Sequence, residues 1–362
     1  MYTEIVKIIE GGLKNEPQKV VQYARRLAEI FEADGNKQFA KGIKAVIANK
    51  GISTLSMEQL ITTAPVDTET RMSIIDLFIP TEDEGNIVLS ESIERKVNEF
   101  IKIIDNKDKI KLHGVSLQST ILLYGKPGVG KNTIAKYISW KTKLPLVITR
   151  LDALISSLLG NTSKNIRRVF EYADSKPCIL FLDEFDAIAK ARDDQHEIGE
   201  LKRVINSLLQ NIDLFAQNNI LIAATNHPEL LDRAIWRRFN TVIEVENLNT
   251  KGVEKLLSLY LRGFEKDFIN DKKYYDKVIN TLSKKSPADI KTIINNTITQ
   301  AIIKDKLTVL SEDILLETFY FDNHGNYSQE DLIKYLNEIG IPKLQIANTL
   351  NISIRQIRNN LK

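Results

Sequence analysis

The stretch Ile121-Leu-Leu-Tyr-Gly-Lys-Pro-Gly-Val-Gly-Lys-Asn-Thr133 decides the fold of this chain. Its first four residues form a short apolar run typical of a buried strand, and a helical pattern follows over Thr133–Trp140. Glycines between a strand and a helix let backbone N–H groups curl around an anion, and the helix N-terminus adds partial positive charge. The segment therefore predicts a phosphate-binding loop. Its residues are Gly125, Lys126, Pro127, Gly128, Val129, Gly130 and Lys131, followed by Asn132 and Thr133 at the start of the helix.

The loop ends in Lys131, which we expect to reach the terminal phosphates of a nucleotide. The next position normally carries Ser or Thr, whose hydroxyl binds Mg²⁺, but in this chain it is Asn132. An amide oxygen can also bind Mg²⁺, so Asn132 either substitutes for the hydroxyl or weakens metal binding and slows turnover. Thr133 is a poor replacement, because one step along a helix rotates a side chain by about 100°.

Polar side chains follow two further apolar runs. Cys178–Leu182 continues into Asp183 and Glu184, and the carboxyl end of a parallel strand is where open α/β sheets bind ligands. We expect Asp183 to hold Mg²⁺, directly or through water, and Glu184 to polarise the attacking water. Ile220–Ala224 is followed by Thr225 and then Asn226, whose amide is expected to lie near the γ-phosphate and help to place that water.

Short apolar runs alternate with helical stretches in the middle of the chain, which predicts a parallel sheet covered by helices on both faces. Before this region the pattern is that of short helices followed by a Pro-, Thr- and Glu-containing linker, with a docking segment at Ile74–Ile79. After it the sequence is helical. The expected divisions are an N-terminal helical bundle (1–50), a linker (51–89), a large α/β domain (90–247), a helical lid (248–321) and a separate helical tail (322–362).

Length, charge and cysteine content bear on the number of domains, on nucleic-acid and membrane binding and on the cellular location. The 362 residues suit two to three domains of about 150 residues each. Fifty basic and 47 acidic residues leave a net charge of +3, too small to indicate nucleic-acid binding by charge alone. The apolar runs are strand-sized, so we expect no membrane span. The N-terminus lacks the pattern of a signal peptide and Cys178 is the only cysteine, which together favour a cytoplasmic location.

These motifs, in this order, resemble the AAA family of ATPases over roughly residues 90–321. Gly125–Lys131 matches Walker A, Ile179–Glu184 matches Walker B, and Asn226 matches sensor 1. The resemblance implies an α/β P-loop fold with a parallel sheet and an α-helical lid. It also implies ATP and Mg²⁺ as cofactors, bound at a site between the subunits of a ring that is usually a hexamer.

Two further segments carry the resemblance. Leu231–Phe239 resembles the arginine-finger region, and its double arginine, Arg237-Arg238, is similar to that of the microtubule-severing and ESCRT-disassembly branch. The resemblance implies that both guanidinium groups reach the γ-phosphate in the neighbouring subunit, where a trans arginine can add about 10³–10⁵ in rate. Ser286–Ile290 resembles the start of the sensor 2 helix, with Pro287 where that branch usually has Gly.

The resemblance also implies a central pore. Leu158-Leu159-Gly160 resembles pore loop 1, where family remodellers usually place an aromatic residue at the position of Leu158. Two leucines offer less surface for gripping a threaded chain. The acidic stretch Asp193–Glu200 lies where a second pore loop would be. Its charge suggests a polar pore lining or a contact between subunits, and it is equally typical of a solvated loop.

The tail, within residues 341–362, resembles a helix-turn-helix. Asn351 is expected to adopt the left-handed conformation of the turn, and Ser353 to cap the second helix. Basic and amide side chains of that helix would then be exposed and able to meet DNA phosphates or base edges. They are Arg355, Gln356, Arg358 and Asn359. The alternative is a compact helical tail that binds protein or its own ring.

We therefore expect an ATP-hydrolysing ring that remodels or delivers a macromolecular partner, with a protein as the favoured partner. One alternative is a nucleotide-switched DNA-binding regulator, which Asn132 and the tail favour. Another is an ATP-dependent adaptor for a partner enzyme such as a peptidase, because the sequence itself contains no protease or nuclease constellation. Glu184 and the paired arginines favour hydrolysis.

Overall fold

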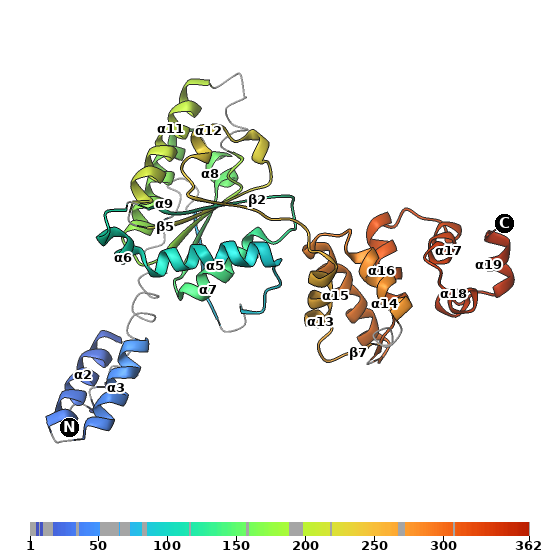
Figure 1. Ribbon diagram of the computed structural model, residues 1–362, viewed down its shortest axis with the longest axis horizontal. Coiled ribbons are helices and arrows are strands. Elements are labelled where there is room, and N and C mark those ends of the chain that lie inside the picture. Colours follow the sequence, from blue (N-terminus) through green and yellow to red (C-terminus); the bar gives the residue numbers. More distant parts are fainter. Residues whose placement is uncertain are drawn as a thin grey trace.

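The computed structural model describes residues 5–6, 8–9, 17–33, 36–50, 65, 73–81, 85–115, 117–156, 159–187, 198–217, 219–266, 272–306 and 308–361. Figure 1 shows a pair of N-terminal helices, a central α/β domain and a C-terminal group of helices. The expected α/β fold with a parallel sheet and a C-terminal helical region is confirmed.

The central sheet has the strand order β1-β3-β4-β5-β2-β6. Its strands are β1 (Asp76–Phe78), β2 (Ser119–Tyr124), β3 (Leu146–Arg150), β4 (Ile179–Asp183), β5 (Ile220–Thr225) and β6 (Thr241–Glu244). Every pairing is parallel except that of β1, which adds antiparallel to β3 at the edge. Strand β1 lies within Ile74–Ile79, which the sequence predicts to be a docking segment of the linker. In the structure this segment adds a strand to the edge of the sheet beside β3.

Helices cover both faces of this sheet, which explains why its strands are apolar on both sides. They are α5 (Glu91–Asp105), α6 (Lys107–Leu112), α7 (Lys131–Thr142), α8 (Leu151–Ser156), α9 (Leu159–Asp174), α11 (Ile198–Phe215) and α12 (Arg233–Trp236), with a short 3₁₀ turn, η2 (Pro228–Leu230). Helices α5 and α7 bury one core, which includes Phe100 and Ile134. Helices α9 and α11 bury the other, which includes Phe170 and Ile212.

The lid and the tail form one hydrophobic core. The lid contains α13 (Thr250–Tyr260), α14 (Lys272–Leu282), α15 (Pro287–Ile303), α16 (Ser311–Asn323) and the strand pair β7 (Glu265–Lys266) and β8 (Thr308–Val309). The tail contains α17 (Gln329–Glu338), α18 (Lys343–Leu350) and α19 (Ile354–Asn360). Leu315 and Ile294 of the lid belong to the same buried cluster as Ile346 and Ile357 of the tail. The tail therefore packs as a continuation of the lid.

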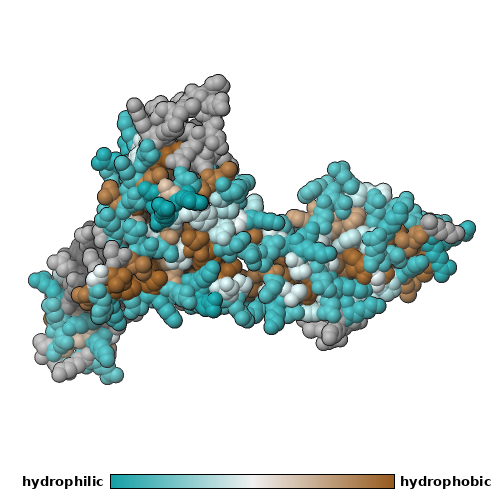
Figure 2. All heavy atoms as spheres, turned by 45° about the horizontal axis from the view of Figure 1, so that its top comes forward, coloured by the Kyte–Doolittle hydropathy of each residue, from teal (hydrophilic) through white to brown (hydrophobic). Residues whose placement is uncertain are grey.

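The turn between α18 and α19 has the expected geometry. Asn351 is left-handed, with φ of 54°. Ser353 caps α19 because its Oγ accepts a hydrogen bond from the N–H of Gln356 at 3.2 Å. The predicted roles of these two residues are confirmed. Figure 2 shows hydrophilic residues over most of the visible surface of the lid and tail, with smaller apolar patches among them.

The N-terminal helices α2 (Pro17–Ala33) and α3 (Lys37–Lys50) pack against each other. Phe31 and Phe39 stack with ring centroids 5.8 Å apart, and the buried apolar residues of this pair include Leu27, Ala28 and Ala40. Across the described residues, no helix combines the length and apolar character needed to span a membrane.

Candidate functional site

The loop between β2 and α7 has a backbone that only glycine adopts readily. Gly128 and Gly130 have φ of 80° and 103°, and Gly125 has φ of 148°. A Cβ atom on Gly125 would lie 2.2 Å from the carbonyl oxygen of Val245, which follows β6. The positive φ angles let the loop turn sharply into α7, so its N–H groups can face a bound anion.

Lys131, the first residue of α7, closes the loop onto the sheet. Its Nζ donates hydrogen bonds to the carbonyl oxygens of Gly125 at 2.6 Å and Lys126 at 3.0 Å, and to Oδ1 of Asn226 at 2.7 Å. The side chain is buried, and burial lowers the pKa of its ammonium group while the nearby Asp183 carboxylate acts in the opposite direction. The contact joins two residues 95 positions apart, both of which the sequence predicts for the site.

Asn226 is oriented by a buried carboxylate that the sequence analysis missed. Oδ1 of Asp186 accepts hydrogen bonds from the Thr225 hydroxyl at 2.9 Å and from the N–H of Asn226 at 3.3 Å. Asp186 is 3% exposed and lies three residues after Asp183. A third acidic residue directly after the β4 strand was the signal that could have identified it.

Asp183 and Asn132 meet at the carboxyl end of β4. Nδ2 of Asn132 donates to Oδ2 of Asp183 at 2.8 Å, and Oδ1 of Asp183 accepts from the N–H of Glu184 at 2.9 Å. With its nitrogen on Asp183, the Asn132 amide turns its oxygen away from the carboxylate. Carboxylate and amide oxygens are both ligands that suit Mg²⁺, so these residues fit the metal once the Asn132 amide rotates to bring its oxygen to the side of the Asp183 carboxylate.

Glu184 has two charged neighbours that the sequence did not predict, one at the end of the adjacent strand β3 and one in the first turn of α8. Oε1 of Glu184 lies 3.7 Å from Nη2 of Arg150, at the end of β3, and the same nitrogen is 2.9 Å from Oδ2 of Asp152. A hydrogen bond with Asp152 is the main cause that raises the pKa of Glu184, and Arg150 opposes it. Glu184 has φ of 53°. Its carboxylate is thus held beside Arg150 and Asp152.

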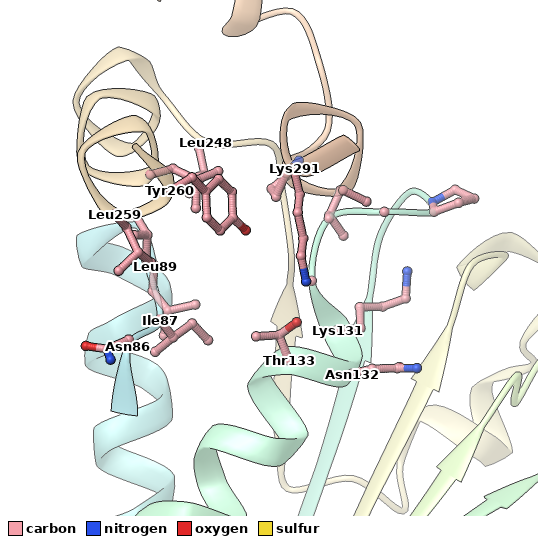
Figure 3. A pocket seen from close by; sticks show the side chains of 18 of the residues that line it. Asn86, Ile87, Leu89, Lys131, Asn132, Thr133, Leu248, Leu259, Tyr260 and Lys291 are labelled. Carbon is pink, nitrogen blue, oxygen red and sulfur yellow. The ribbon is translucent and has the colours of Figure 1, made fainter. Parts of the chain in front are cut away.

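A pocket of about 630 Å³ lies between the loop and the lid. At one end it reaches Asp183, Glu184 and Asn226; at the other, apolar residues of the 86–89 segment and α13 line it. Figure 3 shows Ile87, Leu89, Leu259 and Tyr260 on that apolar side, and Lys131 and Asn132 on the opposite side.

The lid touches the phosphate-binding loop directly. The N–H of Ala288, in the first turn of α15, donates to the carbonyl oxygen of Gly128 at 3.1 Å. Ser286 caps α15 and forms a capping box with Asp289, while Pro287 occupies the first turn, where its missing N–H is not needed. The unusual proline is therefore compatible with the helix start.

The two arginines after α12 have different environments. Arg238 forms a two-point ion pair with Asp213 of α11, at 2.8 and 2.9 Å, and also donates to the carbonyl oxygen of Ala234. Arg237 is exposed, and in the described part of the chain no acidic partner of its side chain is found. Neither residue lines the pocket of its own chain.

Two predicted features lie wholly or partly outside the described residues. Leu158 is not described, and of Leu159 and Gly160 only the backbone, at the start of α9, is described. Of Asp193–Glu200, only the backbone of residues 198–200, at the start of α11, is described. The proposed pore residues therefore stay predictions.

Comparison with known proteins identifies the same family that the sequence motifs resemble. Residues 121–247 match the model of the AAA family, the ATPase family associated with various cellular activities. The chain is 35% identical over 240 residues to an uncharacterised AAA family ATPase of Sinorhizobium fredii, covering 66% of this chain and 73% of the relative. It is 31% identical over 301 residues to a putative 26S proteasome regulatory subunit homologue of Methanocaldococcus jannaschii, covering 81% and 79%. It is also 31% identical to proteasome-activating nucleotidase 1 of Haloferax volcanii, covering 65% and 58%.

Proposed function

This chain belongs to the AAA family of ATPases, and from that membership we propose that it hydrolyses ATP in a ring of identical subunits to remodel or deliver a protein partner. The observation that carries the proposal is the composition of the pocket. It gathers Lys131, Asp183, Glu184 and Asn226, but among its described lining residues there is no arginine. Its described lining thus has the groups for hydrolysis except an arginine, which a second copy of the chain can supply.

In the proposed mechanism, the loop N–H groups and Lys131 hold the triphosphate. Lys131 now donates to two loop carbonyl oxygens and to Asn226, and it would exchange part of these contacts for phosphate oxygens. Asn132 and Asp183 would hold Mg²⁺, which neutralises charge on the phosphates when it is bound. Because Asn132 presents an amide instead of a hydroxyl, we propose that metal binding is weaker than with Ser or Thr.

Glu184 would accept a proton from the attacking water, and Asn226 would position that water. Asp186 would act as a positioning residue through its bonds to Thr225 and Asn226. Arg150 and Asp152 contact the Glu184 carboxylate where it lines the pocket, so they would influence its charge and orientation.

The arginine that completes the site would be Arg237 of a neighbouring subunit. Its side chain is exposed, whereas Arg238 is occupied by Asp213. We propose that Arg237 contacts the γ-phosphate in trans and that Arg238 braces α12 against α11. The family usually forms hexamers, and we propose a hexameric ring here.

For the partner, the relatives support a protein. Two of them are named as a putative proteasome regulatory subunit homologue and a proteasome-activating nucleotidase. These names favour the form of the proposal in which the ring delivers a protein to a partner peptidase. The double arginine supports instead a kinship with the severing and disassembly branch. We place the activity in the cytoplasm, because a single cysteine, Cys178, fits a reducing compartment.

The test is steady-state ATP hydrolysis with Mg²⁺ across protein concentration. We expect the rate per subunit to rise with concentration, because the site is completed by a neighbour, and to vanish in Glu184→Gln. Glu99→Gln, an exposed glutamate on α5, is the matched control. A rate that is independent of concentration down to the detection limit, in a chain that stays monomeric, would contradict the ring.

Asn132 gives a second readout in the same assay. Asn132→Thr is expected to lower the Mg²⁺ concentration needed for half-maximal rate, and Asn132→Ala to raise it by about tenfold. Tight ATP binding without hydrolysis, and hydrolysis restored by Asn132→Thr, would favour a nucleotide-controlled switch over a motor.

We propose DNA contact through the tail as a second candidate function. It is supported by the tight turn at Asn351, the capped helix α19 and the exposed Arg355, Gln356, Arg358 and Asn359. Six tails in a ring would add avidity to one weak contact. Retention of a DNA duplex by the ring at low salt, lost in Arg355→Ala with Arg358→Ala, would support it; equal retention by both proteins would remove it.

A further inference from the structure

The turn that carries the two arginines is tied to the sheet by one hydroxyl group. Thr120 lies on β2, and its Oγ1 donates a hydrogen bond to the carbonyl oxygen of Arg238 at 2.9 Å. The same oxygen accepts a hydrogen bond from the N–H of Asn240, also at 2.9 Å. The Thr120 side chain is fully buried. A single side chain therefore holds the backbone of the turn on both sides of Phe239.

The strand that provides this hydroxyl is a firm support. Strand β2 pairs with β5 on one side and with β6 on the other, so it lies inside the sheet. Core strands of this kind are the last parts of a protein to open. Nδ2 of Asn240 adds a hydrogen bond to the carbonyl oxygen of Gln118 at 2.7 Å, just before β2 begins. The turn is thus fixed relative to the centre of the sheet.

The side chain of Phe239 fixes the turn from a second direction. Its ring packs edge-on against the ring of Phe185 with centroids 5.7 Å apart, and both side chains are buried. Phe185 directly follows Glu184, and its N–H donates to the carbonyl oxygen of Ala224 at 2.8 Å. Because Phe239 is only two residues after Arg237, these contacts determine where the backbone of Arg237 lies.

The Arg237 side chain depends on that backbone position. It is exposed, and within the described part of the chain it has no hydrogen bond or ion pair that would orient it. A misplacement of a catalytic group by about 1 Å can lower a rate by about 10²-fold. A group that sets the turn therefore also sets the direction from which Arg237 approaches another subunit.

We propose that Thr120 is a positioning residue for the trans arginine. Its hydroxyl holds the turn from which Arg237 extends, so it acts on hydrolysis in the neighbouring subunit and not on hydrolysis in its own. In agreement with this, Thr120 does not line the pocket of its own chain. The proposal rests on the trans role of Arg237 in the proposed function, and it adds the residue that orients this arginine.

A double-mutant cycle on kcat tests the proposal, at a protein concentration where assembly is complete. Thr120→Val keeps the branched shape and removes the hydroxyl. We expect it to lower kcat at least about tenfold and to leave the dissociation constant of ATP, measured in the Glu184→Gln background, within about twofold. In the Arg237→Ala background it should lower kcat by less than about twofold, because the hydroxyl acts through an arginine that is already absent.

Mixed rings identify which subunit carries the defect. Thr120→Val chains diluted into excess Glu184→Gln chains receive Arg237 from a neighbour with an intact Thr120, so their rate should match that of wild-type chains in the same excess. Wild-type chains diluted into chains that carry both Glu184→Gln and Thr120→Val should be slowed by the factor found for uniform Thr120→Val rings. The double-mutant cycle uses uniform rings, so it decides the question even if Glu184→Gln chains stop a whole mixed ring.

Two controls separate the hydrogen bonds from packing. Thr120→Ser retains the hydroxyl and should keep kcat within about threefold. Thr149→Val is the matched control, because Thr149 is buried on β3 and among the described residues its hydroxyl has no hydrogen-bond partner. We expect no change of kcat in this variant. If Thr120→Val does not fold, Thr120→Ala takes its place in the cycle.

Three outcomes would overturn the assignment. The first is an unchanged kcat in Thr120→Val. The second is an equally large loss in the Arg237→Ala background, and the third is a slow rate that persists in excess Glu184→Gln chains; either places the defect in the pocket of the same chain. If Arg237→Ala alone left kcat unchanged, the trans arginine of the proposed function would fail first, so the two failures are distinguishable.

Discussion

Two adjacent arginines show how the environment of a residue separates roles that the sequence treats as equal. Arg237 and Arg238 follow α12 directly, but among the residues that the structure describes only Arg238 has an ionic partner, Asp213. A bidentate arginine–carboxylate pair fixes orientation as well as adding energy. Arg237 leaves the same turn after α12 but its side chain is exposed and not held by such a pair. We therefore expect Arg237, and not Arg238, to reach another subunit.

This difference predicts distinct phenotypes. Arg237→Ala should lower kcat by about 10³-fold or more and leave the melting temperature within about 2 °C, because within the described residues its side chain has no hydrogen bond or ion pair to lose. Arg238→Ala should destabilise the fold by about 1 kcal/mol, an effect reproduced by Asp213→Ala. Thermal melting and ATP hydrolysis measure the two effects.

Subunit mixing tests the trans assignment independently. Glu184→Gln and Arg237→Ala chains, each inactive alone, should regain activity when mixed, because some interfaces then combine an intact Glu184 with an intact Arg237. Mixtures that stay inactive, although the chains co-assemble, would contradict a trans role for Arg237.

Cys178 provides a pH-dependent readout of the core. It is 4% exposed directly before β4, and burial raises the pKa of its thiol from 9.0 to about 12. At pH 8 the native thiolate fraction should be about 10³-fold below that of the unfolded chain, so reaction with a disulfide reagent should be correspondingly slow in the native state. Rapid native labelling would contradict the burial.

The same shift has a defined sign for stability. The raised pKa means that the native state keeps its thiol proton when the unfolded chain has lost it. Below pH 9 the contribution to stability is fully present, and it is lost as the pH rises from about 9 to about 12. Cys178→Ala should flatten this part of the stability profile measured by denaturant unfolding.

At the scale of elements, the phosphate-binding loop and the first turn of α15 are in direct contact. A Cβ atom on Gly128 would lie 2.6 Å from Oγ of Ser286, whereas one on Gly130 would have no neighbour within 4 Å. Both glycines have positive φ, so both substitutions strain the backbone, by about 1–2 kcal/mol. Only Gly128 is also constrained by the lid.

Gly128→Ala and Gly130→Ala therefore form a matched pair. Gly128→Ala should separate the lid from the loop, so the amide of Ala288, which donates to Gly128, should exchange its hydrogen faster in the absence of nucleotide. Gly130→Ala should leave that amide protected. Equal protection in both variants would show that the lid contact does not depend on the space at Gly128.

At the scale of the whole molecule, the tail is part of the lid core. Tyr274 and Lys277 of α14 donate hydrogen bonds to Gln345 and to the carbonyl oxygen of Gly340, and the rings of Phe319 and Tyr335 are 4.8 Å apart. Because α13 and α15 of the same lid line the nucleotide pocket, the tail is physically connected to the site. Nucleotide-dependent movement of the lid would carry the tail with it.

Two isoleucines of α19 test this connection. Ile357 is 0% exposed and Ile354 is 36% exposed. Ile357→Ala should destabilise by about 2–4 kcal/mol and lower hydrogen-exchange protection in α14 and α16 as well as in the tail, since they share one core. Ile354→Ala should cost less than about 1 kcal/mol. Loss of protection confined to the tail would show that it is a separate unit.

Local sequence determined the phosphate-binding loop, the buried strands and the ends of several helices. These features depend on residues close in the chain: glycines with positive φ at Gly128 and Gly130, an apolar run before Asp183, and a capping residue such as Ser353. The conformational preference of each residue acts over a few positions, so such patterns can be interpreted without the fold. The sequence placed Lys131 and Asn226 separately near the terminal phosphates, because parallel strands end at the same edge of a sheet, and the structure adds a hydrogen bond between them.

Only the tertiary structure decided which charges meet. The strand order places β3 beside β4, and this brings Arg150 and Asp152 to Glu184. Packing of the lid brings Lys291 into the pocket and unites the tail with the lid core. These contacts join residues far apart in the chain, and they depend on how whole elements bury their apolar faces against one another, which no local pattern specifies.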